Sequence, residues 1–301
     1  MLSKIKNNRH KIKKIIIFYN NYRGLILKDW LKKRKYDVFS IITKKFLNPE
    51  IIKKCKTDDN IMLINSLKNK KVYDFLTSFG ADIFISAGFP HIFSKKFFKL
   101  SKHGIINLHA GKLPKYRGGS PLNWQIINNE KKIGISIIKV DEGIDTGNII
   151  CSDKFKNIRS DTIKEVHLKA NNAFKKLTIK ALELIKRNKR FNKQKISNSY
   201  FFQRKEKDSK IDWSKDALSI YNFVRALSSP YKGAFMLIKN KKYRIYKCEE
   251  VKINPVIKPG NLFKKRGKKE IFIKCKKNSI RIISSDLLKR NIKNLNYETL
   301  E

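Results

Sequence analysis

Cysteines are few in this sequence, and their positions form no pattern. Its 301 residues include four, Cys55, Cys151, Cys248 and Cys275, which lie far apart without any C-x-x-C pair. Structural zinc sites and disulfide frameworks depend on close or regular cysteine spacing. The spacing therefore argues against both, predicts no metal centre and suits a reducing compartment.

Long apolar runs are also missing. No stretch approaches the roughly 20 apolar residues that a membrane-spanning helix needs. The first fourteen residues are basic and contain neither an apolar h-region nor a small-residue cleavage site, so we expect no secretory signal. These absences predict a cytoplasmic protein that does not enter a membrane.

Acidic residues are scarce relative to basic ones. The sequence has 25 Asp and Glu residues and 70 Lys and Arg residues, which gives a formal charge of +45 at pH 7. Such a charge attracts polyanions, including nucleic acid and phosphorylated small molecules. The lysines are nevertheless spread over nearly every segment together with abundant Ile and Asn, as AT-rich coding DNA also produces. Both readings of the charge stay open.

A glycine-rich dinucleotide motif is absent where it would be expected. The first apolar run, residues 14–19, leads into Asn20-Asn21-Tyr22-Arg23-Gly24 and not into G-x-G-x-x-G. Without that fingerprint a dinucleotide site is not supported. A cation at this turn, Arg23, could meet a phosphate group of a substrate, or could be an ordinary surface residue.

The N-terminal half alternates apolar strand-like and helix-like runs. An apolar content of 41% over 301 residues predicts one large domain with a smaller one. Short β-branched runs alternate with amphipathic segments, which indicates βαβ units in a doubly wound, mostly parallel α/β sheet. Ligands bind such sheets at the carboxyl ends of the strands, where Gly88 and His109 would lie. The predicted strands are residues 14–19, 36–43, 60–64, 81–87 and 104–109.

Residues 105–148 carry side chains suited to acyl chemistry. Asn107 and His109 are two apart in a predicted strand, so they point to the same side. Asp145 follows a later strand, residues 133–140, in an acidic, glycine-rich turn. Asn, His and Asp can respectively donate to an oxyanion, relay a proton and orient the relay. The alternative is a structural histidine beside two ordinary turns.

Three blocks in this stretch resemble the folate-dependent formyltransferases. They are Asn107-Leu108-His109, the run from Lys112 to Gly118 (KLPKYRG), and Gly134-Ile135-Ser136-Ile137 leading to Asp141-Glu142-Gly143-Ile144-Asp145-Thr146-Gly147. The resemblance implies a formyltransferase-like variant of the Rossmann fold with Asn107, His109 and Asp145 as the catalytic trio. Asp145 is then expected to raise the pKa of His109 and hold it near neutrality. One departure is Lys139, where an aromatic or aliphatic residue is expected.

The resemblance also implies a co-substrate and its contacts. The co-substrate is 10-formyltetrahydrofolate, which donates the formyl group to an amine. The residues expected to line its pocket are Gly88, Phe89, Pro90, His91, Ile92, Val140, Asp141, Glu142, Gly143 and Ile144. Those expected to contact the acceptor are Arg23, Lys112, Lys115, Tyr116 and Arg117, although the loop cations could equally be solvated surface charges.

The remaining sequence predicts a long helix and a second domain. Thr162 and Glu165 form a capping box before apolar residues that recur every three or four positions up to Ile185. Beyond a polar linker, short β-rich runs alternate with Pro, Gly and Asn turns, which suggests a small OB-like β-barrel. The predicted division is a basic tail (1–13), a catalytic domain (14–188), a linker (189–213) and the OB-like domain (214–301).

The sequence leaves the amine acceptor open. The loop from His109 to Pro114 is closer to the nucleotide-sugar enzymes of this family than to the tRNA enzyme, and its cations suit a diphosphate. Initiator methionyl-tRNA is the alternative, favoured by the charge and by a basic second domain. A non-catalytic RNA-binding protein with a relict folate site is a third reading, and a homodimer is left open.

Overall fold

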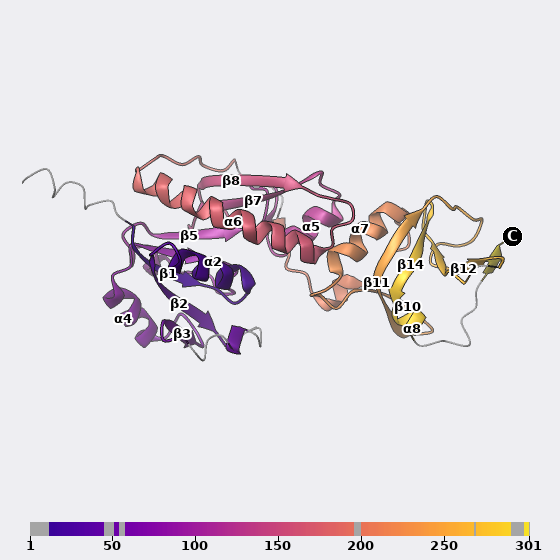
Figure 1. The fold of residues 1–301 in the computed structure, drawn as a ribbon, viewed down its shortest axis with the longest axis horizontal. Coiled ribbons are helices and arrows are strands. Elements are labelled where there is room, and N and C mark those ends of the chain that lie inside the picture. Colours follow the sequence, from indigo (N-terminus) through magenta and orange to yellow (C-terminus); the bar gives the residue numbers. More distant parts are fainter. Residues whose placement is uncertain are drawn as a thin grey trace, which may run out of the picture. The chain divides into compact units, whose positions relative to one another are not determined.

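The computed structural model describes residues 12–44, 51–53, 58–195, 200–267, 269–289 and 298–300 (Figure 1). Residues 1–11 of the predicted basic tail lie outside this range, as does Cys55. The chain divides into two compact units. The first comprises Met1–Gly118, Gly134–Phe155 and Lys169–Tyr200, and the second comprises Gly119–Ile133, Lys156–Leu168 and Phe201–Glu301. The domain boundaries given above stay predictions.

A mixed sheet forms the centre of the first unit. Within the described residues its strands lie in the order β3-β2-β1-β4-β5-β7-β8, with β1 to β5 parallel to their neighbours and β7 antiparallel to β5. The chain runs outward from β1 to β3 and returns beside β1, so a topological switch point lies between β1 and β4. The strands are β1 (Lys14–Phe18), β2 (Asp37–Thr43), β3 (Ile61–Ile64), β4 (Ile83–Ser86), β5 (Ile105–His109), β7 (Lys132–Lys139) and β8 (Ile149–Lys156).

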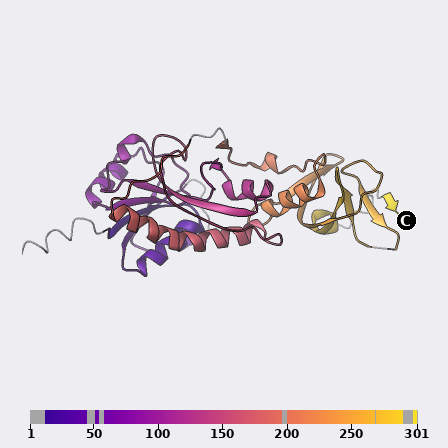
Figure 2. The ribbon, with the colours of Figure 1, turned by 90° about the horizontal axis from the view of Figure 1, so that it is seen from above.

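Helices cover both faces of this sheet, as the unbroken apolar strands predict. On one face α4 (Lys70–Phe79) places Val72 and Leu76 in a cluster with Ile16 and Phe84. The α4 helix ends at Gly80, whose φ of 65° is a left-handed conformation that favours glycine. On the other face lie α2 (Tyr22–Lys32) and the long α6 (Ile163–Lys186), which Figures 1 and 2 show running beside the strands.

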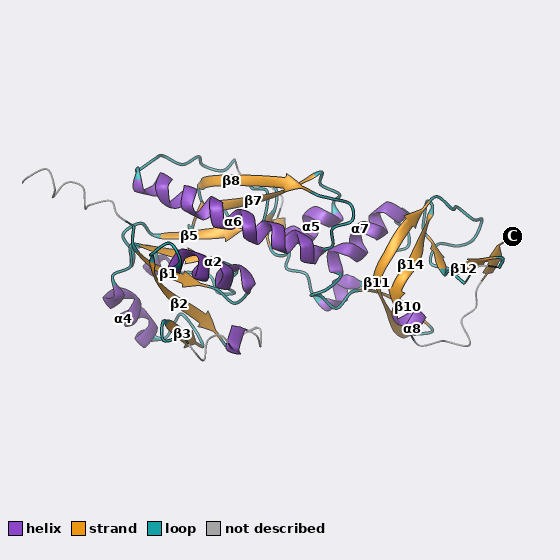
Figure 3. Ribbon diagram, in the orientation of Figure 1, coloured by secondary structure: helices purple, strands orange, loops and turns teal. Residues whose placement is uncertain are grey.

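The second unit contains the predicted small β domain. Its strands are ordered β10-β11-β14-β13-β12-β15, antiparallel except for the β12–β15 pair. Helix α7 (Ala217–Leu227) lies beside this sheet (Figure 3). Its Ile220 and Val224 belong to the buried core of the domain. The elements are α5 (Pro121–Ile127), η3 (Glu206–Ser209), β10 (Ala234–Ile238), β11 (Lys241–Val251), β12 (Leu262–Lys265), β13 (Phe272–Lys274), β14 (Ser279–Ser285), α8 (Asp286–Lys289) and β15 (Glu298–Leu300).

The fold class predicted from the sequence is confirmed. The first five predicted strands agree with β1 to β5 to within two residues at each end. The described cysteines, Cys151, Cys248 and Cys275, are buried free thiols. Burial raises the pKa of Cys151 to about 12, which keeps the thiol protonated and unreactive. No helix in the described residues is long and apolar enough to cross a membrane.

Candidate active site

The carboxyl end of β5 presents two of the predicted site residues, Asn107 and His109. In the β5–β7 register Asn107 lies opposite Ile138 and His109 opposite Ser136. The His109 side chain is almost completely buried, whereas Asn107 is half-buried. This end of β5 lies two strands from β1, beside the switch point where α/β sheets bind their ligands.

Asp145 reaches both residues from a distant turn. Its Oδ1 accepts a hydrogen bond of 3.1 Å from the Asn107 amide nitrogen, and its Oδ2 lies 3.2 Å from Nδ1 of His109. The backbone N–H of Gly118 also donates to Oδ2, at 3.0 Å. Asp145 itself has a φ of 54°, a left-handed conformation that few non-glycine residues adopt. The structure thus brings the predicted trio into one hydrogen-bonded cluster.

The second imidazole nitrogen of His109 contacts the backbone. Its Nε2 lies 2.5 Å from the carbonyl oxygen of Tyr116. A Cβ atom on Gly111 would stand 2.3 Å from this Nε2 and 2.4 Å from the Tyr116 oxygen, so only glycine fits at position 111. The loop is fixed by Ser136, whose hydroxyl donates to the Gly111 carbonyl at 2.9 Å.

The pKa of His109 departs from the expectation. Burial lowers the pKa of His109 below its ordinary value, and the nearby Arg23 guanidinium lowers it further. The Asp145 carboxylate acts in the expected upward direction, as does the Tyr116 carbonyl, but burial outweighs both. The prediction that Asp145 holds the pKa of His109 near neutrality was therefore wrong, because burial lowers this pKa more than Asp145 raises it. At pH 7 the imidazole is mainly neutral, which suits a proton acceptor.

Of the residues predicted to bind the acceptor, Arg23 lies near His109 and Tyr116 is buried. The Arg23 Nη1 donates to the Leu108 carbonyl at 3.2 Å, and its guanidinium lies 4.9 Å from the centre of the Phe174 ring. The side chain therefore braces β5 against α6. The Tyr116 side chain is fully buried, so it offers no surface to a substrate. The ring of a tyrosine is largely apolar, so its burial stabilises the fold more than contact with a polar acceptor would. The motif alone does not show that the side chain points inward.

The loop cations predicted to contact the acceptor remain accessible. Lys112 and Lys115 are exposed, and Arg117 is half-buried. The Lys115 ammonium lies 5.2 Å from the centre of the Tyr116 ring. These groups follow the carboxyl end of β5, and their contact with the acceptor stays a prediction.

Two segments predicted to line the folate pocket carry exposed apolar side chains. Ile92 is 75% exposed and Ile144 is 47% exposed. An ion pair of 2.8 Å between Lys95 and Glu142 joins the two segments. A Cβ atom on Gly88 would stand 1.9 Å from the Asn21 amide nitrogen, so the first segment leaves β4 in close contact with the turn after β1.

The other predicted folate residues have internal contacts. Phe89 packs edge-on against Phe18, with ring centres 5.3 Å apart, and Nε2 of His91 lies 3.3 Å from the Thr43 hydroxyl. Asp141 accepts hydrogen bonds from the Gly143 N–H at 3.2 Å and from the Thr146 hydroxyl at 2.6 Å. Pro90, in the middle of the first segment, is exposed, and Val140, at the start of the second, is half-buried.

Gln194 is a site residue that sequence reasoning missed. It lies in the predicted linker, yet its Nε2 donates to the carbonyls of Asp145, at 2.9 Å, and Gly147, at 2.7 Å. It is also buried, so this part of the linker packs on the first unit. A single glutamine in a polar, unpatterned run gives no sequence signal. Among the described residues no group of His, Cys, Asp and Glu could hold a metal ion.

Comparison with protein families gives two matches along the chain. The family described as formyl transferase matches residues 4–182, and the formyl transferase C-terminal domain matches residues 204–296. The bifunctional polymyxin resistance protein ArnA of Wigglesworthia glossinidia brevipalpis is 34% identical over 299 residues, which are 94% of this chain and 45% of the relative. This chain therefore spans less than half of that relative. The methionyl-tRNA formyltransferase of Orientia tsutsugamushi is 30% identical over 74% of this chain and 72% of the relative.

Solved structures give similar matches. The crystal structure of WlaRD, a sugar 3N-formyl transferase with dTDP and 5-N-formyl-THF present, has a TM-score of 0.68 at 25% identity and covers 90% of this chain and 97% of its own. The N-formyltransferase from Helicobacter canadensis, in complex with folinic acid and dTDP-3-aminofucose, has a TM-score of 0.67 at 23% identity over 90% of this chain and 98% of its own.

Proposed function

The chain belongs to the formyl transferase family, and we propose that it transfers the formyl group of 10-formyltetrahydrofolate to the primary amine of an amino-deoxy nucleotide sugar. The observation that carries the proposal is the convergence of Asn107, His109 and Asp145 beside exposed cations. Support for the sugar comes from the sugar 3N-formyl transferase WlaRD, which this chain matches over nearly its whole length.

The trio fits an amine attacking a formyl carbon. One N–H of the Asn107 amide is used by Asp145, and the other is available to the formyl oxygen as that oxygen gains negative charge. The amine loses a proton as it forms the new C–N bond, and Nε2 of neutral His109 takes this proton once it has turned from the Tyr116 carbonyl oxygen. Asp145 fixes the imidazole orientation through Nδ1 and stabilises the imidazolium that results.

The folate segments fit a planar, partly apolar co-substrate. Ile92 and Ile144 offer exposed apolar surface on the two segments, and an exposed ion pair links Glu142 of the second segment to Lys95, just after the first. The backbone of residues 141–144 lies on the second segment, and apart from the Gly143 N–H, which donates to Asp141, its polar groups could meet a heterocycle with several polar edges. On the acceptor side, Lys112, Lys115 and Arg117 would neutralise a diphosphate.

Initiator methionyl-tRNA is the second candidate acceptor. Methionyl-tRNA formyltransferases are among the relatives, and the net charge of +45 would favour an RNA phosphate backbone. Under this proposal RNA binding weakens steeply with salt, whereas a sugar nucleotide held by a few cations depends on salt much less. The homodimer stays a prediction.

The deciding experiment supplies the purified full-length chain with 10-formyltetrahydrofolate and one acceptor at a time. The acceptors are amino-deoxy nucleotide sugars and charged initiator tRNA, and the readouts are release of tetrahydrofolate and the mass of the acceptor. We expect formylation of the sugar. The same rate with Lys112→Ala and Lys115→Ala combined would contradict the diphosphate assignment, and formylation of tRNA alone would replace the sugar as acceptor.

A further inference from the structure

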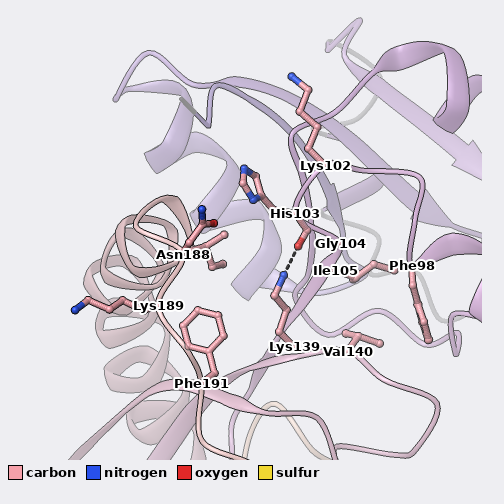
Figure 4. A pocket seen from close by; sticks show the side chains of 11 residues that line it. Phe98, Lys102, His103, Gly104, Ile105, Lys139, Val140, Asn188, Lys189 and Phe191 are labelled. Carbon is pink, nitrogen blue, oxygen red and sulfur yellow. Dashed lines mark hydrogen bonds between the residues drawn. The ribbon is translucent and has the colours of Figure 1, made fainter. Parts of the chain in front are cut away.

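A cavity of about 460 Å³ lies at the amino end of β5, away from the catalytic residues at its carboxyl end. Its walls come from the segment before β5, the end of β7, and the end of α6 with the residues that follow, all in the first unit (Figure 4). The lining residues are Phe98, Lys102, His103, Gly104, Ile105, Lys139, Val140, Ile185, Asn188, Lys189 and Phe191.

The polar part of this cavity faces away from the catalytic trio. Lys139 lies opposite Ile106 in the β5–β7 register, whereas Asn107 lies opposite Ile138. Directly opposed residues of an antiparallel pair point to the same face, and successive residues of a strand point to opposite faces. The Lys139 side chain therefore leaves the sheet on the face opposite to Asn107 and His109.

Lys139 is a partly buried cation without a carboxylate partner in the described part of the chain. Its ammonium donates a hydrogen bond to the His103 carbonyl (Figure 4), and no ion pair with an acidic side chain is formed. Burial alone lowers the pKa of Lys139, with no nearby charge opposing it. Buried ammonium groups are normally paired, so the remaining N–H groups of Lys139 mark a place for an anion.

The surroundings of Lys139 combine apolar walls with further cations. Figure 4 shows Phe191 and Asn188 on the α6 side of the cavity, across from Lys139 and Gly104. Gly104 has no side chain, and a Cβ atom there would stand 3.8 Å from the Lys139 nitrogen. Lys189 also lines the cavity and adds to the positive potential.

The second lysine at the mouth of the cavity contributes less charge. Lys102 lines the cavity but pairs with Asp82 at 2.7 Å, so its charge is largely neutralised. Lys139 and Lys189 therefore give the cavity its net positive character. This volume is within the range of small-molecule sites in proteins, which combine apolar walls with a few polar groups.

We propose that this cavity binds a small planar organic anion, with the anionic group on the Lys139 ammonium and the ring against Phe191. The ligand class is an aromatic ring that bears a phosphate or a carboxylate. The site does not depend on the proposed function, although Val140 lines this cavity and also belongs to the predicted folate pocket. Lys139, which departs from the apolar residue expected in the family, supplies its specificity.

The test is calorimetric titration of the full-length chain with phenyl phosphate, benzoate and inorganic phosphate in separate experiments. We expect saturable binding of phenyl phosphate, of benzoate or of both. Inorganic phosphate, which has no ring, should bind at least about tenfold more weakly. Lys139→Met removes the charge and keeps the apolar stem, so affinity should fall at least about tenfold. Lys132→Met, on the exposed start of the same strand, is the matched control and should bind as the wild type does.

Three outcomes would overturn the site. They are no saturation with any ring-bearing anion, equal affinity in Lys139→Met and wild type, and displacement of the probe by folinic acid, which would assign the cavity to the folate pocket. If Lys139→Met does not fold, hydrogen exchange of the wild type with phenyl phosphate replaces it. Protection of residues 102–105 and 185–191 supports the proposal, and protection of residues 109–117 alone contradicts it.

Discussion

His109 in the first unit and Arg225 in the second are almost equally buried, at 5% and 6% exposure. The Arg225 guanidinium donates to the side chains of Asn222, at 2.8 Å, and Asn157, at 3.1 Å, and to the carbonyl of Asp161, at 2.8 Å. Each of these partners belongs to the second unit, and the cluster joins segments of that unit to one another. Arg225 is thus fully engaged in holding the fold.

The His109 cluster is arranged differently. Its imidazole is oriented by Asp145 and by the Tyr116 carbonyl, but the adjacent Asn107 amide keeps an N–H for a ligand. Burial of an ionisable group therefore does not by itself identify a site. What distinguishes a site is a buried network that leaves a donor or acceptor uncommitted beside accessible surface.

Replacing His109 should have the largest effect on activity and should show most clearly that the two clusters have different roles. In His109→Ala the proton acceptor is lost, and we expect kcat to fall by about 10²–10³, the range seen when one essential group is removed from an acyl-transfer site. Folding should persist, as measured by circular dichroism. His167→Ala, a half-exposed histidine of the second unit, is the control and should retain its rate. Wild-type turnover by His109→Ala would remove the basis of the proposed mechanism.

Replacing Arg225 should have the opposite effect. Arg225→Met leaves several buried acceptors without a donor, and we expect the free energy of unfolding to fall by about 2–3 kcal/mol. Urea unfolding measures this change, and kcat of the remaining folded protein should stay near wild type. Arg159→Met, which removes an exposed arginine paired with Glu250, should change stability little. A large loss of kcat with unchanged stability would place Arg225 in the catalytic process.

Local patterns predicted the strands and the residues they present. The β-branched runs gave β1 to β5, because parallel strands covered on both faces are continuously apolar. Asn107 and His109 share a side because strands have a period of two, and the motif placed Asp145 near them. Lys139 stood out as a departure from the family pattern, although its cavity could not be foreseen.

Features that depend on tertiary packing could not be predicted. The net pKa of His109 depends on how much solvent the whole fold excludes, which two neighbouring motifs do not specify. The ring of Tyr116 is buried, and the Arg23 guanidinium of α2 lies against the Phe174 ring of α6, a contact between residues 151 positions apart in the sequence. Gln194 contacts Asp145 across 49 residues of sequence, with no periodic signal.

Gln194 offers an intermediate test, because it orients the cluster without touching the reacting atoms. Gln194→Ala removes two hydrogen bonds to the turn that carries Asp145, so we expect kcat to fall about tenfold while KM for the folate changes little. Steady-state kinetics measures this split. Gln203→Ala, an exposed glutamine bonded to Ser120, is the matched control. A rise in KM with unchanged kcat would instead indicate a contact with the co-substrate.

The smallest expected effect is in the pH profile of kcat/KM for wild type. Because burial lowers the pKa of His109 below 6.5, the enzyme should retain more than half of its plateau rate at pH 6.5 and lose activity only in more acidic solution. The Asp145 carboxylate raises this pKa, so Asp145→Asn should move the acidic midpoint to still lower pH as well as reduce the rate. Arg225→Met should leave the midpoint unchanged.

The lowered pKa of His109 also makes the stability of the fold depend on pH. Above pH 6.5 His109 is neutral in the folded and the unfolded chain, so it adds no pH dependence. As the pH falls below 6.5, the unfolded chain takes up the proton before the folded chain does. This stabilises the unfolded state, so the free energy of unfolding falls until the pH reaches the pKa of His109 in the folded state. His109→Asn should therefore lose less stability than wild type between pH 6.5 and that lower pKa in urea unfolding. An acidic midpoint above 6.5, or a variant more acid-sensitive than wild type, would mean that Asp145 outweighs burial and that His109 reacts from its charged form.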